Sequence, residues 1–304
     1  MKSIILCVLC VSAVIILVGC SKTSEPVNRS MDGVKPPTET TPAPDYQKSI
    51  TEMKTELGAD FIVESLPPFV IAGNIPQREF DRFKTHTIGD CAAALYKDYF
   101  TKKPDYILKV YLFGGAPSYE AYVKKVEGRE PSSPYGYYMD SSKSLIMNIA
   151  TGGGTLVHEM VHALIKPDFP DVPAWFNEGL GSLYEQCRVD EDGHLHGLIN
   201  WRYPILMDAV EKNWLVPLKE LFSTTDNEFY NRGKGTNYAQ ARYFCLYMQE
   251  NKLLSKFYKK FRDNFNSDKT GIKFIEEIFG KPIDEIDKDW QAWVPTVKNI
   301  ESLR

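Results

Sequence analysis

Residues Thr155 to Leu164 combine an apolar helical stripe with two histidines spaced four residues apart. The apolar residues recur at i, i+3, i+4 and i+7, which predicts a helix with one buried face. On that helix His158 and His162 stack over a single face, with Glu159 beside them, so both imidazoles can reach one metal ion. This segment therefore requires a fold that buries the back of the helix and leaves its histidine face open. The apolar stripe consists of Val157, Met160, Val161 and Leu164.

A catalytic zinc site has three protein ligands and an open position for water, so a third ligand is expected nearby. A second helix is predicted to begin at Pro173, with Glu178 one turn into it. The connection from Lys166 to Val172 is short enough to force the two helices into contact. Glu178 is therefore the predicted third ligand. The alternatives are Asp168, Asp171 and Glu185.

The segments HEMVH and WFNEGL together resemble the gluzincin metallopeptidases, specifically the peptidase-MA-like bacterial families. The resemblance extends over most of the chain after residue 46 and implies a zincin-like fold and a peptide or protein substrate. It implies that His158, His162 and Glu178 bind one Zn²⁺ per chain and that Glu159 is the general base. Ser182 stands where thermolysin-like enzymes carry an aspartate that orients a histidine, so the partner of His158 is open.

Gluzincins often use a tyrosine or histidine to stabilise the negative charge that develops during hydrolysis. Tyr238 is the catalytic candidate by motif, although its helical stripe with apolar residues favours a core position equally. The other candidates, His194 and His196, follow the polar run Asp190 to Gly193. For both of them a solvated loop is the favoured interpretation.

The order of predicted elements is α+β, with an α/β part over residues 46–150 and a helical part over residues 151–304. We expect a helix over 46–57, strands at 69–71 and 107–113, and a long helical segment from Pro76 to Tyr99. Residues 135–139 and 144–149 are predicted to form a hairpin. If the second strand of that hairpin lies at the sheet edge, an extended peptide could pair with it beside the metal.

The amino-terminal residues predict an export signal and a lipid anchor. Residues 1–19 have the apolar run of a signal peptide, and Leu17-Val18-Gly19-Cys20 resembles the lipobox of bacterial lipoproteins, with Cys20 as the lipidated residue. A plain signal anchor is the alternative. The proline-rich residues after Cys20 predict a disordered tether through residue 45. We expect a lipid-anchored protein of the bacterial cell envelope, on the outer membrane or its periplasmic face in a diderm organism.

The near balance of 36 basic and 40 acidic side chains gives no reason to expect a nucleic-acid partner. A basic set on one predicted helix could face a membrane, but a solvated face is favoured; it comprises Lys256, Lys259, Lys260 and Arg262. Three cysteines follow the tether, Cys91, Cys187 and Cys245, which permits at most one internal disulfide. Which of them pair, and the oligomeric state, are open.

These observations together predict a lipid-anchored zinc metallopeptidase. The first alternative is a catalytically inactive zincin-fold lipoprotein that binds or scaffolds other molecules. The second is a metal enzyme that acts on another amide, such as a cell-wall crosslink.

Overall fold

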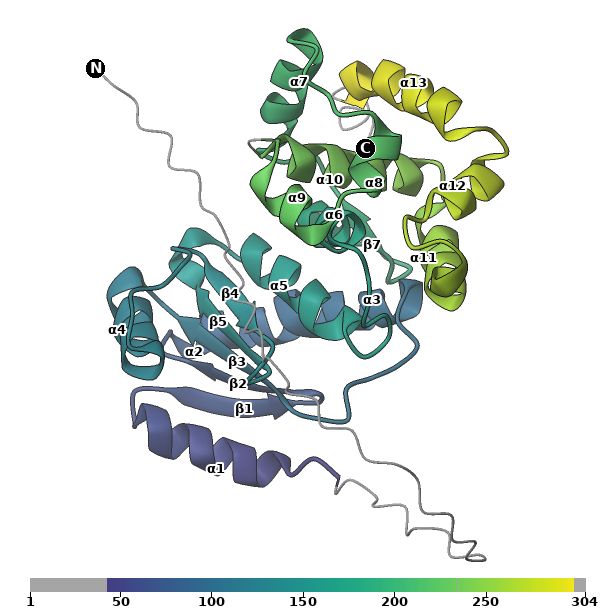
Figure 1. Ribbon diagram of the computed structural model, residues 1–304. Coiled ribbons are helices and arrows are strands. Elements are labelled where there is room, and N and C mark those ends of the chain that lie inside the picture. Colours follow the sequence, from purple (N-terminus) through teal and green to yellow (C-terminus); the bar gives the residue numbers. More distant parts are fainter. Residues whose placement is uncertain (1–42, 234, 298–304) are drawn as a thin grey trace, which may run out of the picture.

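The computed structural model describes residues 43–233 and 235–297 (Figure 1). The predicted signal peptide (1–19), the lipidated Cys20 and the tether up to residue 42 lie outside the described residues. Among the helices that are described, none has the length and apolar content needed to cross a membrane. The first described element is α1 (Tyr46–Leu57), where Asp45 accepts a hydrogen bond from the backbone N–H of Lys48 at 2.9 Å and so caps the helix.

A five-stranded mixed sheet forms the centre of the amino-terminal part, in the order β1-β2-β3-β5-β4. The three central strands are parallel, and the two outer strands each run antiparallel to their neighbour. Parallel neighbours need crossover connections, and helices supply them here. The strands are β1 (Ile62–Leu66), β2 (Phe69–Gly73), β3 (Leu108–Phe113), β4 (Gly136–Met139) and β5 (Ser144–Asn148).

Side chains alternate between the two faces of the sheet along each strand. Apolar side chains on both faces pack against helices. On β2, Val70 and Ala72 face the layer formed by α1 and α4 (Ala116–Glu127). Phe69 and Ile71 face the opposite layer, which contains the metal-helix candidate α5 (Gly154–Ile165). That layer also contains one long helical segment, comprising α2 (Gln77–Arg82), a π-helix (Phe83–Asp90) and α3 (Cys91–Asp98).

The carboxy-terminal part is mostly helical, as the sequence predicts, and packs beside α5 and α3 (Figure 1). Its exception is a small hairpin of β6 (Cys187–Val189) and β7 (Leu195–Gly197). The helices are α6 (Ala174–Leu183), α7 (Tyr203–Glu211), α8 (Leu218–Phe222), α9 (Asp226–Asn231), α10 (Thr236–Glu250), α11 (Leu254–Asn264), α12 (Ile272–Phe279) and α13 (Ile283–Trp293).

The structure confirms the coarse α+β prediction and the elements predicted before residue 150. Two elements before residue 150 were missed, β1 and α4. The strand β1 has no clear alternation, but α4 carries an apolar stripe at helical spacing that was overlooked, formed by Tyr119, Tyr122, Val123 and Val126. The condition set for peptide pairing with residues 144–149 is not met, because these residues do not form an edge strand. β5 lies between β3 and β4, so the edge beside α5 belongs to β4. The hairpin itself is correct, but its first strand, rather than its second, is the outer one.

A buried carboxylate joins the two parts of the chain. Asp168, in the connection after α5, accepts hydrogen bonds from the backbone and hydroxyl of Thr101, the backbone N–H of Lys102, and the hydroxyl of Tyr258. Arg262 of α11 completes the set with an ion pair of 2.6 Å. Burial alone would raise the pKa of Asp168, but these bonds lower the pKa to about 2. Arg262, one of the basic side chains of α11, therefore serves an internal contact.

Substituting Asp168→Asn should lower the free energy of unfolding at pH 7 by about 3 kcal/mol, because Arg262 loses its buried partner. The contribution of a carboxylate with a depressed pKa is complete above a pH of about 4 and is lost as pH falls toward 2. The difference between the native chain and the variant should therefore shrink over that interval. Urea unfolding at a series of pH values measures this difference in free energy of unfolding. A difference that stays constant down to pH 2.5 would contradict the role of Asp168 as a buried, ionised partner of Arg262.

Candidate metal centre

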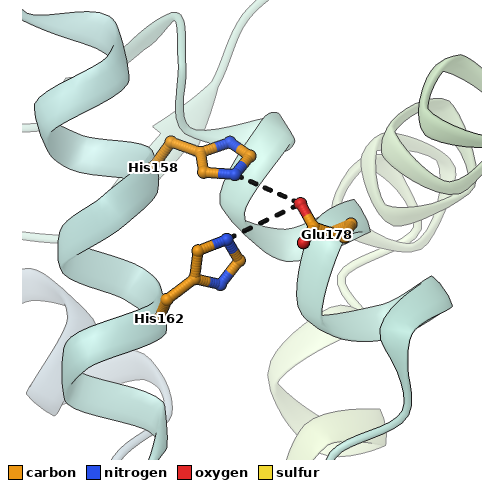
Figure 2. Close-up of side chains that lie close together, drawn as sticks. All are labelled: His158, His162 and Glu178. Carbon is orange, nitrogen blue, oxygen red and sulfur yellow. Dashed lines mark ion pairs between the residues drawn. The ribbon is translucent and has the colours of Figure 1, made fainter. Parts of the chain in front are cut away.

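The two histidines of α5 lie side by side on the helix face that is turned toward α6 (Figure 2). Their ring centroids are 4.6 Å apart, and the opposite stripe of α5 is buried in the main core, as predicted. Of the His158 side chain 10% is exposed, and of the His162 side chain 15%. The helix therefore holds both imidazoles in a nearly dry site that retains limited access from solvent.

Glu178 of α6 points at both imidazoles, in agreement with the predicted packing of the two helices (Figure 2). Its Oε2 atom is 3.2 Å from Nε2 of His158 and 3.6 Å from Nε2 of His162. These three side chains form the group that could hold a metal ion among the described residues. Glu178 occupies the place expected of the third ligand.

The arrangement fits the requirements of a zinc ion. Tetrahedral coordination with zinc-to-ligand distances of about 2.0–2.1 Å places neighbouring ligand atoms about 3.3 Å apart. The two distances from Glu178 Oε2 bracket that value. Two imidazole nitrogens and one carboxylate oxygen are also a donor set that catalytic zinc sites use.

The pKa values of His158, His162 and Glu178 are all shifted by their contacts with one another. Burial would lower the pKa of His158, but the carboxylates of Glu178 and Glu185 raise the pKa to about 10. The pKa of His162 is also raised, against the effect of burial, by Glu178. Burial would raise the pKa of Glu178, yet His162 and His158 hold it well below its usual range. A buried carboxylate in this position is stabilised by a cation, supplied either by protonated imidazoles or by a metal.

Each imidazole has a partner on the side that faces away from Glu178. Nδ1 of His162 lies 3.0 Å from Oδ1 of Asn177, the residue before Glu178 on α6. Nδ1 of His158 lies 3.3 Å from Oε1 of Glu185, although it forms no well-directed hydrogen bond. Contacts of this kind set the ring orientation and the tautomer of a metal-binding histidine.

The residue beside Nδ1 of His158 is Glu185, and not Ser182. Ser182 is fully buried, and its hydroxyl has no hydrogen-bond partner among the described residues. Glu185 lies just beyond the end of α6 and forms a two-pronged pair with Arg202, with distances of 2.7 and 2.9 Å. Burial would raise the pKa of Glu185, but His158 and Arg202 lower it to about 2. Sequence analysis identified Glu185 as a possible metal ligand, whereas the structure places it behind His158.

Two further residues shape the site and were missed from sequence. The hydroxyl of Tyr230 on α9 donates a hydrogen bond of 2.9 Å to Oε1 of Glu178, which leaves Oε2 for the histidines. Gly181 lies directly against the imidazoles: a Cβ there would be 3.2 Å from His162 and 3.3 Å from His158. A glycine three residues after Glu178 was visible in the sequence, but only the packed helices show why it is needed.

Glu159 lies on the same helix and is partly exposed. Its Oε2 accepts a hydrogen bond of 2.9 Å from the backbone N–H of Tyr138 on the edge strand β4. The carboxylate is therefore tied to the end of the sheet that borders the histidine face.

The remaining candidates lie in other surroundings. Asp168 belongs to the junction described above, and Asp171 is exposed. His194 pairs with Asp98 at 2.5 Å and His196 with Asp190 at 2.9 Å, so both hold the β6–β7 hairpin. His194 lies in the turn before β7, in agreement with the loop interpretation, whereas His196 lies in the strand β7 itself.

Tyr238 is half-buried on α10 and packs against Tyr230 with a centroid separation of 6.4 Å. The guanidinium of Arg202 lies 5.0 Å from its ring centroid. Tyr230 is thus a tyrosine that donates a hydrogen bond to the candidate metal-binding residue Glu178. The catalytic role of Tyr238 stays a prediction.

Comparison with models of known protein families and with curated proteins finds no match to this chain.

Replacing Glu185 with Gln should weaken metal binding by about 10- to 100-fold, because His158 loses the carboxylate that orients its ring. Competition for Zn²⁺ with a chromogenic chelator measures the affinity directly. Glu211→Gln, which changes an exposed carboxylate at the end of α7, is the matched control. Equal affinities for the two variants would show that Glu185 does not support the site.

Proposed function

We propose that this protein is a zinc-dependent metallopeptidase with a zincin-like fold. The observation that carries the proposal is the convergence of Glu178 Oε2 on the Nε2 atoms of both histidines, with Glu159 next to them on α5. The resemblance of the two sequence segments to gluzincins supports the same conclusion independently of the geometry. His158, His162 and Glu178 would hold one Zn²⁺.

A zinc ion bound by these residues would supply Lewis acidity, polarising a carbonyl and lowering the pKa of bound water to about 7. Glu159 would accept a proton from water and pass it to the departing amine. Its hydrogen bond from Tyr138 fixes one carboxylate oxygen, Oε2, and leaves Oε1 for the proton. Tyr230 and Asn177 keep the ligand side chains in position during the reaction.

The edge strand β4 supports the proposal that the substrate is an extended peptide. In an antiparallel pair of strands, opposite residues alternate between hydrogen-bonded and non-hydrogen-bonded pairs. Asn148 donates its N–H to the carbonyl of Tyr135, so this pair is hydrogen-bonded, and the pairs formed by Gly136 and Tyr138 are not. The N–H and C=O groups of Gly136 and Tyr138 therefore point away from β5. The N–H of Tyr138 donates to Glu159, which leaves the C=O of Tyr138 and both groups of Gly136 for an added peptide. A peptide added to β4 would run past Glu159, which lies at that edge. The strand-addition hypothesis is thus transferred from residues 144–149 to β4.

A cleft of about 540 Å³ adjoins the metal-binding group and offers room for a substrate side chain. His162, Asn177 and Tyr230 contribute to its wall at the metal side. Ile165, Phe222 and Phe265 also line it, with lysines and aspartates among the other lining residues. The mixture supports binding of a peptide with both apolar and polar groups, so side-chain preference has to be measured.

Anchoring by lipid at Cys20 and location in the bacterial envelope remain part of the proposal. They rest on residues 1–19 and on the tetrad that ends at Cys20. The alternative of a non-catalytic scaffold has less support, because all three ligands and the base are present and converge.

Substituting Glu159→Gln should abolish peptide hydrolysis while zinc stays bound, because the amide cannot accept the proton and is not a predicted ligand. We expect a loss of at least about 100-fold in kcat, measured with a mixed peptide library and mass spectrometry. Metal content is measured in parallel, with Glu191→Gln in the exposed turn before β7 as the control. A chelator should remove the activity of the native chain.

The outcomes separate the competing functions. Full activity in Glu159→Gln would refute the assigned base. Zinc bound with no cleavage of any peptide in the native chain would favour a scaffold or an enzyme for another amide, and cleavage of peptidoglycan crosslinks would identify the latter.

A further inference from the structure

Three cysteines lie in the described part of the chain, and their surroundings differ sharply. Cys245 of α10 is fully buried, and its sulfur packs against Gly179 of α6. Burial raises the pKa of its thiol above the usual range. Cys91 is buried at 6% exposure, and Cys187 is half-buried at the start of β6.

The fold aligns Cys91 with Cys187 although they lie in different parts of the chain. At the far end of α3, Asp98 pairs with His194 and accepts a hydrogen bond of 2.9 Å from the N–H of Leu195. This clamps the β6–β7 turn to the carboxyl end of α3. From Cys91 to Asp98 the helix rises about 10 Å, and three strand residues from Cys187 to the turn also span about 10 Å.

Equal lengths from a shared clamp bring the two cysteines to the same level, where each side chain shifts the pKa of the other. The contact lowers the pKa of the Cys91 thiol and raises that of Cys187, as expected when the Cys187 S–H donates to the Cys91 thiolate. The Cys91 thiol also lies 3.8 Å from the carbonyl oxygen of His86. A carbonyl acceptor favours the protonated thiol, so the lowered pKa of Cys91 comes from its contact with Cys187.

We propose that Cys91 and Cys187 form a reversible disulfide that links α3, on the same face of the sheet as α5, to the hairpin that follows α6. The reaction is thiol–disulfide exchange with a small disulfide as the oxidant. The Cys91 thiolate attacks one sulfur of that disulfide and releases one thiolate. Cys187 then loses its proton, and its sulfur displaces the second thiolate from the mixed disulfide. Two protein thiols are oxidised, and one external disulfide is reduced to two thiols.

The position of this bond gives it a structural consequence. The chain between Cys91 and Cys187 includes both helices of the metal centre, and Glu185 lies two residues before the bridge. Closing so long a loop restricts the unfolded chain strongly and should stabilise the fold. The inference does not depend on the proposed peptidase activity.

The test is peptide mapping of the full chain after incubation with oxidised or reduced glutathione, followed by alkylation with iodoacetamide under native conditions, digestion without reduction, and mass spectrometry. We expect a crosslinked peptide pair containing Cys91 and Cys187 in the oxidised sample only. In each sample Cys91 and Cys187 should be in the same state, either linked to each other or both alkylated. Cys245 should be alkylated only after denaturation. Glutathione that remains attached to either cysteine, or alkylation of both after oxidation, would overturn the proposal.

Thermal unfolding provides a second measurement. Oxidation should raise the midpoint of the native chain by on the order of 10 °C. Cys91→Ser and Cys187→Ser should lose this response, whereas Cys245→Ser should keep it. If a variant does not fold, the comparison of the oxidised and reduced native chain still decides, because an unchanged midpoint together with unlinked peptides refutes the bridge.

Discussion

A single carboxylate oxygen, Oε2 of Glu178, lies close to Nε2 of both imidazoles that α5 presents, and the candidate metal centre is built around this contact. A buried carboxylate is costly unless positive charge or hydrogen bonds surround it. Here both are supplied, by the histidines on one side and by Tyr230 on the other. The packing of α6 against α5 and α10 is what brings these groups to one point.

The close approach of these helices requires small residues on α6. Gly179 allows the backbone of Ala241 on α10 to lie where a side chain would otherwise collide, and Gly181 leaves space for the imidazoles. Arg242 of α10 then donates hydrogen bonds to the carbonyls of Ser182 and Leu183, which satisfies the end of α6. These hydrogen bonds fix where the chain leaves α6, and Glu185 then lies beside Nδ1 of His158.

Much of this architecture was predictable from local pattern. The amphipathic stripe of α5, the helix that begins after Pro173 and the hairpin of β4 and β5 were all expected from periodicity and turn residues, and the structure confirms them. The order of strands was not, because nothing in the alternation along residues 144–149 says which neighbours they pair with. The contacts of Glu159 with Tyr138 and of Glu178 with Tyr230 were missed for the same reason: each joins residues that local spacing does not relate.

The sequence by itself determined that two histidines share one helical face, since the rotation of an α-helix places residues i and i+4 together whatever the rest of the chain does. It also limited the third ligand to a few carboxylates on a short connection and the next helix. The tertiary structure distinguishes these candidates: Asp168 pairs with Arg262, Glu185 pairs with Arg202, and Glu178 faces Nε2 of both imidazoles. Such assignments depend on helix packing and burial, which are properties of the folded chain as a whole.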